Sequence, residues 1–323
     1  MAEAPRSPQA SRTNVVADRA MAAPTDMHLP MTAAAPPRKA VFRSKYLANT
    51  RLKIGLLIIA MLIAVFAIAV FFTDLDPYRQ SLLMRLKPPG SFGRDGHHYL
   101  LGTDQFGRDV LARLIYGIRV PLTVALLSAV LGAVLGLAIG LPAGYFGGPL
   151  DGLLSYVVDV QLSLPFILIA LFVLALFGSS VPNIILVFAS LSWPIVARVA
   201  RVSARQLRSS LFIEACKAAG LSTTRILLRH VVPNALPPVI AIMAVQVSQF
   251  VIAESSLGFF GLGVAPPEPT WGNMLADGRD YMSQAWWMNV FPGLGIVLLA
   301  GAANIFGEGL REVLDPREGN ADV

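Results

Sequence analysis

Long runs of apolar residues are the feature that most limits what this chain can fold into. Each run has about 20 residues, the length that a helix needs to cross the hydrocarbon core of a bilayer. Backbone N–H and C=O groups find no water there and must bond within the segment, so such runs fold as helices. Six spans are expected: Leu52–Phe72, Val120–Tyr145, Leu153–Phe177, Pro182–Val199, Leu236–Leu257 and Asn289–Phe306. The sequence therefore predicts an all-α, polytopic membrane protein.

The composition agrees with a membrane protein and disfavours other classes. Hydrophobic residues make up 55% of the chain and charged residues only 14%, whereas about a quarter of a soluble domain is charged. The net charge of +6 is interpreted as membrane-side positive charge. No nucleic-acid partner is expected, because no polar domain gathers Lys and Arg with aromatic residues. The single cysteine, Cys216, excludes an internal disulfide and is expected to be a reduced thiol.

The chain divides into four segments. Residues 1–37, rich in Ala, Pro, Ser and Thr, are predicted to form a disordered tail, and they have no apolar core of a signal peptide. Residues 38–100 hold the first span and the start of an extracytoplasmic loop. Residues 101–317 hold the other five helices, and residues 318–323 form a polar tail.

Basic residues indicate the orientation in the membrane. A basic cluster precedes the first span and places the N-terminus in the cytoplasm, and six spans return the C-terminus to the same side. Seven Lys or Arg and a single acid, Glu214, lie between residues 198 and 229, whereas the loop after the fifth span holds one Arg, Arg279. Several Arg residues in the polar segment before the second span argue against placing that segment outside the cytoplasm, although the positive-inside rule weakens for longer loops. The cytoplasmic termini remain the prediction.

An amphipathic helix is expected in the polar segment before the second span. Asp104 or Thr103 is predicted to cap a helix that begins near Gln105. Its apolar residues recur at spacings of three and four: Val110, Leu111, Leu114 and Ile115. Such an amphipathic helix is expected to lie against the membrane or the bundle. Further on, glycines spaced by four in the second span predict close helix packing there.

The polar, basic segment between the fourth and fifth spans has the pattern of two short helices joined at a glycine. Ser209–Ala219 is rich in helix-forming residues, and Gly220 can take the left-handed conformation that ends a helix. Ser222 or Thr223 is expected to cap the second helix, and Pro233 to break the pattern before the next span. A compact helix–turn–helix on the polar side of a membrane protein suits docking of another protein.

This segment resembles the EAA loop of the permease subunits of bacterial ABC importers. The resemblance rests on the Glu-Ala start, a glycine six residues after the Glu, and a distal His-x-x-Pro-Asn: Glu214, Ala215, Gly220, His230, Pro233 and Asn234. It implies that residues 209–234, within a loop over 199–235, form a coupling helix that sits in a groove of an ATPase subunit.

Three further segments resemble the dipeptide, oligopeptide and nickel branch of this family, in its C-type subunit. They are Leu101–Leu122, Glu254–Leu275 and Asn304–Arg317, and the resemblance covers about residues 40–317. It implies six helices of the type I importer permease fold in the bacterial cytoplasmic membrane. It also implies a second permease in a heterodimer, two ATPase subunits, an extracytoplasmic substrate-binding protein and membrane lipid as partners. The implied substrates are di- or oligopeptides, with nickel, glutathione or another small solute as alternatives.

ATP chemistry is expected on the partner subunits, so the chain is not predicted to be an enzyme. It has no G-x-x-x-x-G-K-[ST] segment, the motif that cradles nucleotide phosphates, and no cofactor of its own is expected. His97 and His98 are interpreted as a solvated loop pair, because no Cys or further His lies at metal-ligand spacing. A stand-alone secondary transporter would need ion-coupling charges in several helices, and a membrane enzyme would need a catalytic motif; both are disfavoured.

Two acids in or beside apolar spans, Asp159 and Glu254, admit two interpretations. Intramembrane acids commonly face a cavity or a partner, which would make them a pathway or gate element. Equally, each can lie near a membrane surface and bond to backbone or to a neighbouring Arg. Trp271, Trp286 and Trp287 are expected to anchor the chain at the membrane interface, with reception of the binding protein as the alternative.

Overall fold

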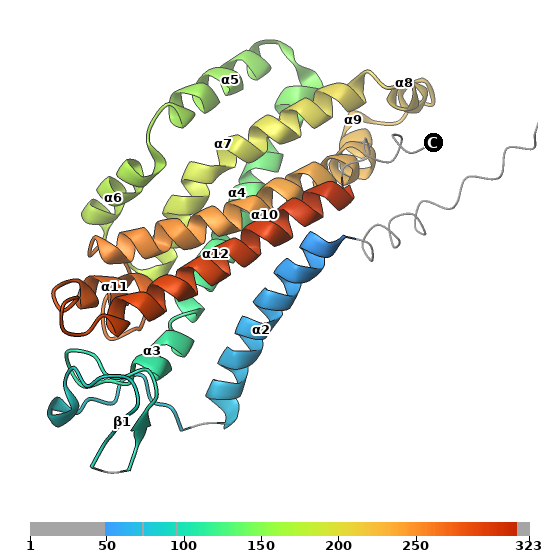
Figure 1. Cartoon of the computed structure of the whole chain (residues 1–323). Coiled ribbons are helices and arrows are strands. Elements are labelled where there is room, and N and C mark those ends of the chain that lie inside the picture. Colours follow the sequence, from blue (N-terminus) through green and yellow to red (C-terminus); the bar gives the residue numbers. More distant parts are fainter. Residues whose placement is uncertain (1–48, 73, 95, 315–323) are drawn as a thin grey trace, which may run out of the picture. The chain divides into compact units, whose positions relative to one another are not determined.

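The computed structural model describes residues 49–314, except residues 73 and 95. The predicted tails 1–37 and 318–323 lie outside the described residues. The described residues are mostly helical (Figure 1). Their elements in chain order are α2 (Thr50–Phe72), the 3₁₀ turn η1 (Leu82–Met84), β1 (Ser91–Phe92), β2 (His98–Tyr99), α3 (Val110–Tyr116), α4 (Arg119–Phe146), α5 (Gly148–Leu162), α6 (Phe166–Phe177), α7 (Val181–Arg208), α8 (Leu211–Ala218), α9 (Thr223–Ile226), the π-helical turn η2 (Leu227–Val231), α10 (Val232–Phe259), α11 (Trp271–Arg279) and α12 (Trp287–Leu314).

The predicted polytopic architecture is confirmed, with one span broken. Within residues 49–314, five helices are long and apolar enough to cross a membrane, and α5 with α6 makes a sixth candidate if the pair counts as one span. The prediction of one continuous helix over Leu153–Phe177 is wrong, because α5 and α6 meet at an angle of 82°. Pro165 lies at the break. It has no N–H to donate, and it disfavours helical conformation in the residue before it.

Glycines bring α4 and α7 close together, as their spacing predicts. A Cβ added to Gly136 would lie 2.6 Å from Cβ of Val196, and one added to Gly140 would collide with the backbone of Ala197. Small residues at such positions let helix backbones approach within a membrane. The α4–α7 pair therefore packs as one unit of the bundle.

The start of α2 is tied to the end of α12, beside which it lies in Figure 1. A Cβ on Gly309 would lie 2.5 Å from the backbone nitrogen of Leu52. Asn49 Nδ2 donates to Glu312 at 2.8 Å, and Arg51 Nη1 donates to the same carboxylate at 2.6 Å. Packing and charge thus join the first and last spans.

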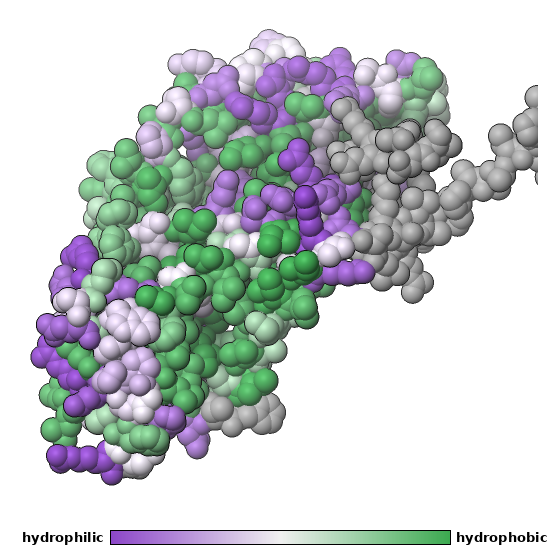
Figure 2. All heavy atoms as spheres, viewed as in Figure 1, coloured by the Kyte–Doolittle hydropathy of each residue, from purple (hydrophilic) through white to green (hydrophobic). Residues whose placement is uncertain are grey.

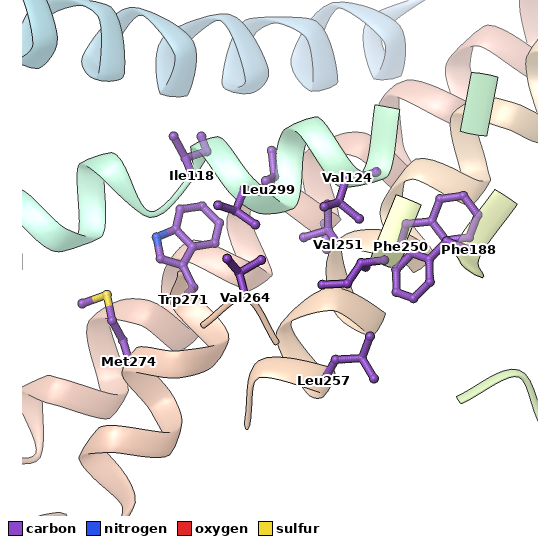
Figure 3. Packing of buried hydrophobic residues seen from close by; sticks show 14 of the residues in the cluster. Ile118, Val124, Phe188, Phe250, Val251, Leu257, Val264, Trp271, Met274 and Leu299 are labelled. Carbon is purple, nitrogen blue, oxygen red and sulfur yellow. The ribbon is translucent and has the colours of Figure 1, made fainter. Parts of the chain in front are cut away.

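Aromatic and branched side chains from several helices fill the core that Figure 3 shows, with Phe188 of α7 next to Phe250 of α10. Trp271 also lies in this core and is only 2% exposed. Its Nε1 donates to the carbonyl of Leu114 at 2.8 Å, and the buried Trp287 donates to the carbonyl of Thr103 at 3.1 Å. A buried indole needs such a partner. Interfacial anchoring is therefore wrong for Trp271 and Trp287, whereas Trp286 is exposed.

The helix expected near Gln105 begins later and is buried. It is α3, whose N-cap is Asp109, with a carboxylate that accepts from the Leu111 backbone N–H at 2.8 Å. The expected cap Asp104 instead bonds the backbone of the loop around Phe106. Ala112 and Arg113 are buried together with Val110, so α3 packs into the bundle, against α2 and α12. An aliphatic stripe alone could not reveal that an Arg shares the buried face.

Two further expectations in the central segment are wrong. Helix α7 continues past Val199 to Arg208, so the first part of the predicted loop 199–235 is helix. Pro233 does not interrupt the chain, because it lies in the first turn of α10, directly after η2. Proline is tolerated in a first turn, and the π-helical turn accommodates the change in hydrogen bonding.

Candidate functional site

The predicted coupling segment folds as a helical hairpin at one end of the bundle. We call residues 211–231 the coupling hairpin: α8, the turn at Gly220, α9 and η2. Gly220 has φ +76°. Its N–H donates to the carbonyl of Lys217 at 2.9 Å, and the N–H of Leu221 donates to that of Cys216 at 3.1 Å. This is the Schellman arrangement that ends helices, so the sequence prediction for Gly220 is confirmed. Ser222 occupies the N-cap position of α9, although its side chain makes no capping bond within the described residues.

Three apolar side chains anchor the coupling hairpin to the bundle. Ile213, Ile226 and Val231 are buried in one cluster. The cluster also contains Tyr145 at the end of α4 and Ala204 in α7. The hairpin therefore packs directly against the end of α4 and against α7.

The outer face of the coupling hairpin is exposed and partly apolar. Leu211 is 84% exposed, and Phe212 and Leu228 are also exposed, beside the exposed carboxylate-bearing Glu214. Exposed large apolar side chains of this kind are typical of surfaces that bind another protein or a membrane. In Figure 2, hydrophobic side chains occupy the middle of the visible face and hydrophilic ones gather towards its ends.

The structure brings some of the predicted loop residues together and places others apart. The His230 ring meets the Phe212 ring edge-on, with centroids 5.1 Å apart, so it supports the exposed face of α8. Glu214 and Ala215 lie on the exposed side of α8. Pro233 and Asn234 belong to α10, where Asn234 Nδ2 donates to the backbone carbonyl of His230 at 2.6 Å. These two residues shape the helix that leaves the hairpin.

Arginines of α7 bind the α4–α5 turn beside the hairpin. Asp151, the acid near the start of α5, pairs with both Arg201 and Arg205. Arg208 Nη1 donates to the backbone carbonyl of Phe146 at 3.0 Å. Sequence reasoning missed Asp151, although an acid at the start of a span opposite a surplus of arginine was a usable signal. Arg201 and Arg205 therefore hold α5 against α7, and Arg208 holds the end of α4.

The two predicted pathway acids lie in different surroundings. Asp159 of α5 pairs with Arg198 of α7 at 2.6 Å, and its side chain is 68% exposed. Glu254 of α10 is fully buried, and neither carboxylate oxygen has a hydrogen-bond partner within the described residues. The neighbouring Arg foreseen in the second interpretation is present for Asp159 and is not found for Glu254 in the part of the chain that the structure describes.

A cavity of about 400 Å³ lies at the break between α5 and α6. Its other walls come from α7 and α10. Four polar side chains line it among apolar ones: Gln161, Ser192, Gln246 and Gln249. Sequence reasoning did not single out these glutamines, although glutamine within an apolar span is itself a signal of a polar path.

The family model for the inner membrane component of binding-protein-dependent transport systems matches residues 136–320. The chain belongs to this family, and it is a permease subunit of an ABC importer in the bacterial inner membrane. The recognition made from the sequence motifs is thereby confirmed.

Named relatives extend the match over most of the chain. The dipeptide transport system permease protein DppC of Escherichia coli K12 is 40% identical over 79% of this chain and 86% of its own length. DppC of Alkalihalophilus pseudofirmus is 36% identical over 88% of this chain and 91% of its own length. An inward-facing structure of the MetNI methionine ABC transporter shares the fold, with a TM-score of 0.50 and 21% identity over 63% of this chain and 96% of that one.

Proposed function

We propose that this chain is one of two different permeases of an importer for di- or oligopeptides. In this proposal two ATPase subunits hold ATP and Mg²⁺, an extracytoplasmic binding protein delivers the substrate, and both termini face the cytoplasm. The names of the relatives support the peptide substrate, since DppC of E. coli is a dipeptide permease. No cofactor is assigned to this chain itself.

The coupling hairpin is the observation that carries the proposal. Its face is exposed, apolar and acidic at Glu214, as a surface fitted to an ATPase groove requires. Its inner side is fixed to α4 and α7 through Ile213 and Ile226. Asp151 extends the connection to α5 through Arg201. Closure of the ATPases would therefore move α4, α5 and α7 together.

Asp159 and Glu254 are proposed as pathway elements of the same machine. Asp159 and Arg198 bridge α5 and α7, and Arg198 lies one helical turn beyond the cavity-lining Ile195 in the direction of the coupling hairpin. The pair thus stands at the hairpin side of the cavity, where a gate to the cytoplasm would lie. Glu254 is a buried acid whose carboxylate has no hydrogen-bond partner among the described residues, and intramembrane acids commonly face a cavity or a partner, which supports a pathway role.

Two substitutions test the coupling. Glu214→Ala removes an exposed charge without altering the fold, and it should lower dialanine uptake by the assembled importer about tenfold, the effect of losing one strong interface contact. ATP hydrolysis should continue, because the nucleotide sites lie on other subunits. Gly220→Ala should act in the same direction, because φ +76° costs an alanine about 1 kcal/mol.

Gly261→Ala is the matched control for the glycine. Gly261 has φ +80°, and, as at Gly220, an added Cβ would meet no described atom within 4 Å, so the backbone strain is the same at a site far along the chain. Uptake and hydrolysis are measured in proteoliposomes that contain all subunits. Unchanged uptake in both Glu214→Ala and Gly220→Ala would refute the coupling role.

The substrate class has its own test. Dialanine, Ni²⁺ and glutathione are offered in turn to the complete importer, and only dialanine should be taken up. Uptake of Ni²⁺ or glutathione instead would contradict the peptide assignment and leave the permease role intact. Uptake by this chain without ATPase subunits would indicate a secondary transporter.

A further inference from the structure

The cavity at the α5–α6 break is polar without being charged. Gln161 lies at the end of α5, Ser192 on α7, and Gln246 and Gln249 on α10. All other residues that line the cavity are Leu, Ile, Phe or Ala, and no lining residue is titratable. A volume of about 400 Å³ lies within the usual range for sites that enclose small molecules, about 300–1,000 Å³.

One wall of the cavity is formed by the non-helical connection between α5 and α6. Leu164 and Phe166, on either side of Pro165, both line the cavity. Irregular backbone at membrane depth is tolerated only where protein buries it or where it borders a watery cavity. Broken helices of this kind form the substrate sites of many transporters. The break therefore supports an aqueous chamber at this place.

Gln246 supplies a hydrogen-bonding group that the described residues leave unused. Its residue is 3% exposed, and its Nε2 donates to the backbone carbonyl of Ser192 at 3.3 Å. A carbonyl can only accept, so this bond fixes the orientation of the amide. The Oε1 atom then remains a buried acceptor without a partner in the described part of the chain. A buried acceptor without a hydrogen bond destabilises the fold. A substrate N–H that entered the cavity and moved the side chains of its wall could donate a hydrogen bond to this oxygen.

Gln249 and Gln161 add both kinds of hydrogen-bonding group. Gln249 lies one helical turn beyond Gln246, is exposed, and makes no hydrogen bond within the described residues. Gln161 Nε2 donates to the carbonyl of Ser190 at 2.7 Å, which holds this side chain at the rim. An amide side chain can donate and accept at once. It therefore complements a peptide group, which presents one N–H and one C=O.

We propose that this cavity is a subsite for the backbone amide groups of the transported peptide. The inference rests on the proposed peptide substrate and adds where and how the permease holds it. The uncharged lining leaves the amino and carboxyl termini of the peptide unrecognised at this point. The apolar walls accept differing side chains, so the subsite recognises what all peptides share.

Gln249→Leu and Gln246→Leu test the subsite in the complete importer with its partner permease, ATPases and binding protein. Each variant should lower dialanine uptake about fivefold, the effect of one uncharged hydrogen bond. ATP hydrolysis stimulated by the loaded binding protein should persist. Gln249 is exposed, so its replacement does not disturb folding even if Gln246→Leu fails to assemble. Gln284→Leu, an exposed glutamine outside the cavity, is the matched control and should keep wild-type uptake.

Labelling gives a second readout that does not depend on transport rate. Gln249→Cys is reacted with a maleimide during turnover, and the wild-type chain, whose single cysteine is Cys216, gives the background. Dialanine should slow the labelling of position 249 about fivefold, whereas labelling of Gln284→Cys, an exposed position in a turn outside the cavity, should be unaffected.

The outcomes separate this subsite from the proposed function. Dialanine uptake by the wild type together with unchanged uptake in both glutamine variants, or with no protection at position 249, overturns the subsite and leaves the peptide importer standing. Absence of dialanine uptake by the wild-type complex overturns both.

Discussion

The two ends of the bundle each pair an aspartate with two arginines, but the two clusters differ in how far they are exposed to solvent. At the α11 end, Asp104 binds Arg108 at 2.5 Å and lies 3.6 Å from Arg113, and its side chain is only 5% exposed. Asp277 of α11 reaches the same two arginines at 3.3 and 3.8 Å. At the α8 end, Asp151 pairs with Arg201 and Arg205, and its side chain is more accessible, at 13%.

The contrast separates a fixed end from one that can move. Removing one partner of a buried charge cluster leaves uncompensated charge, so such a cluster resists rearrangement. At the α8 end Arg205 is 58% exposed, so its contact with Asp151 can be exchanged for water at lower cost. Tyr78 reinforces the fixed end by donating to Glu268 at 3.2 Å. Burial, and then the nearby Glu268 carboxylate, raise the pKa of this hydroxyl and keep it a donor. We infer that the α11 end is the scaffold against which the α8 end moves.

Asp104→Ala should have the largest effect on stability, because among the described residues it leaves the buried Arg108 and Arg113 with Asp277 as their one remaining ion-pair partner. A loss of about 3 kcal/mol in unfolding free energy is expected, which lowers the apparent thermal midpoint by roughly 6–10 °C. The midpoint is followed by size-exclusion of the fluorescently tagged full chain after heating.

Two variants sharpen this result. Asp280→Ala removes an acid whose side chain is 76% exposed beside Arg279, and it should shift the midpoint little. Asp104→Asn keeps an acceptor for the Phe106 and Arg108 backbone N–H groups and should retain part of the stability. Equal midpoints for Asp104→Ala and Asp280→Ala would show that the buried cluster at the α11 end contributes no more to stability than an exposed acid at the same end.

Asp151→Ala should have an intermediate effect. It removes the acceptor of two charged hydrogen bonds at a site where Asp151 is largely buried but Arg205 is 58% exposed, and a loss of about 2 kcal/mol is expected. Because this acid joins α5 to α7 beside the coupling hairpin, peptide uptake should fall more than the stability loss alone explains. The stability and uptake of Asp151→Ala are compared with those of Arg205→Ala, which keeps the ion pair between Asp151 and Arg201. A midpoint shift for Asp151→Ala as large as that of Asp104→Ala would show that the α8 end is equally fixed.

The sequence allowed the spans and the coupling hairpin to be placed because each depends on local pattern. Helix length, the spacing of Gly132, Gly136 and Gly140, and the left-handed turn at Gly220 need no knowledge of the neighbours. The break at Pro165 was missed because proline inside an apolar run can either kink or end a helix, and packing decides between them.

The burial of polar side chains could not be predicted from the local sequence pattern. Trp271 and Arg113 lie inside because residues far away in the chain provide their partners, Leu114 for the indole and Asp277 for the guanidinium. Asp151 was missed for the same reason, since its arginines follow some 50 residues later. The acids Asp159 and Glu254 were noticed from the sequence, but only the structure separates a paired, exposed acid from a buried one without a partner in the described residues.

Asp159→Ala should have the smallest effect on stability and so isolates function from folding. The Asp159–Arg198 pair is exposed on both sides, and such pairs contribute about 0.5 kcal/mol or less. If the pair closes the hairpin side of the cavity, its loss should raise ATP hydrolysis in the absence of loaded binding protein and lower the yield of peptide per ATP. The double variant Asp159→Arg with Arg198→Asp restores the pair in reverse and should recover coupling, which a double-mutant cycle quantifies. Recovery would assign the pair to the gate. Normal coupling in Asp159→Ala would reduce it to a surface contact and leave Glu254 as the acid to pursue.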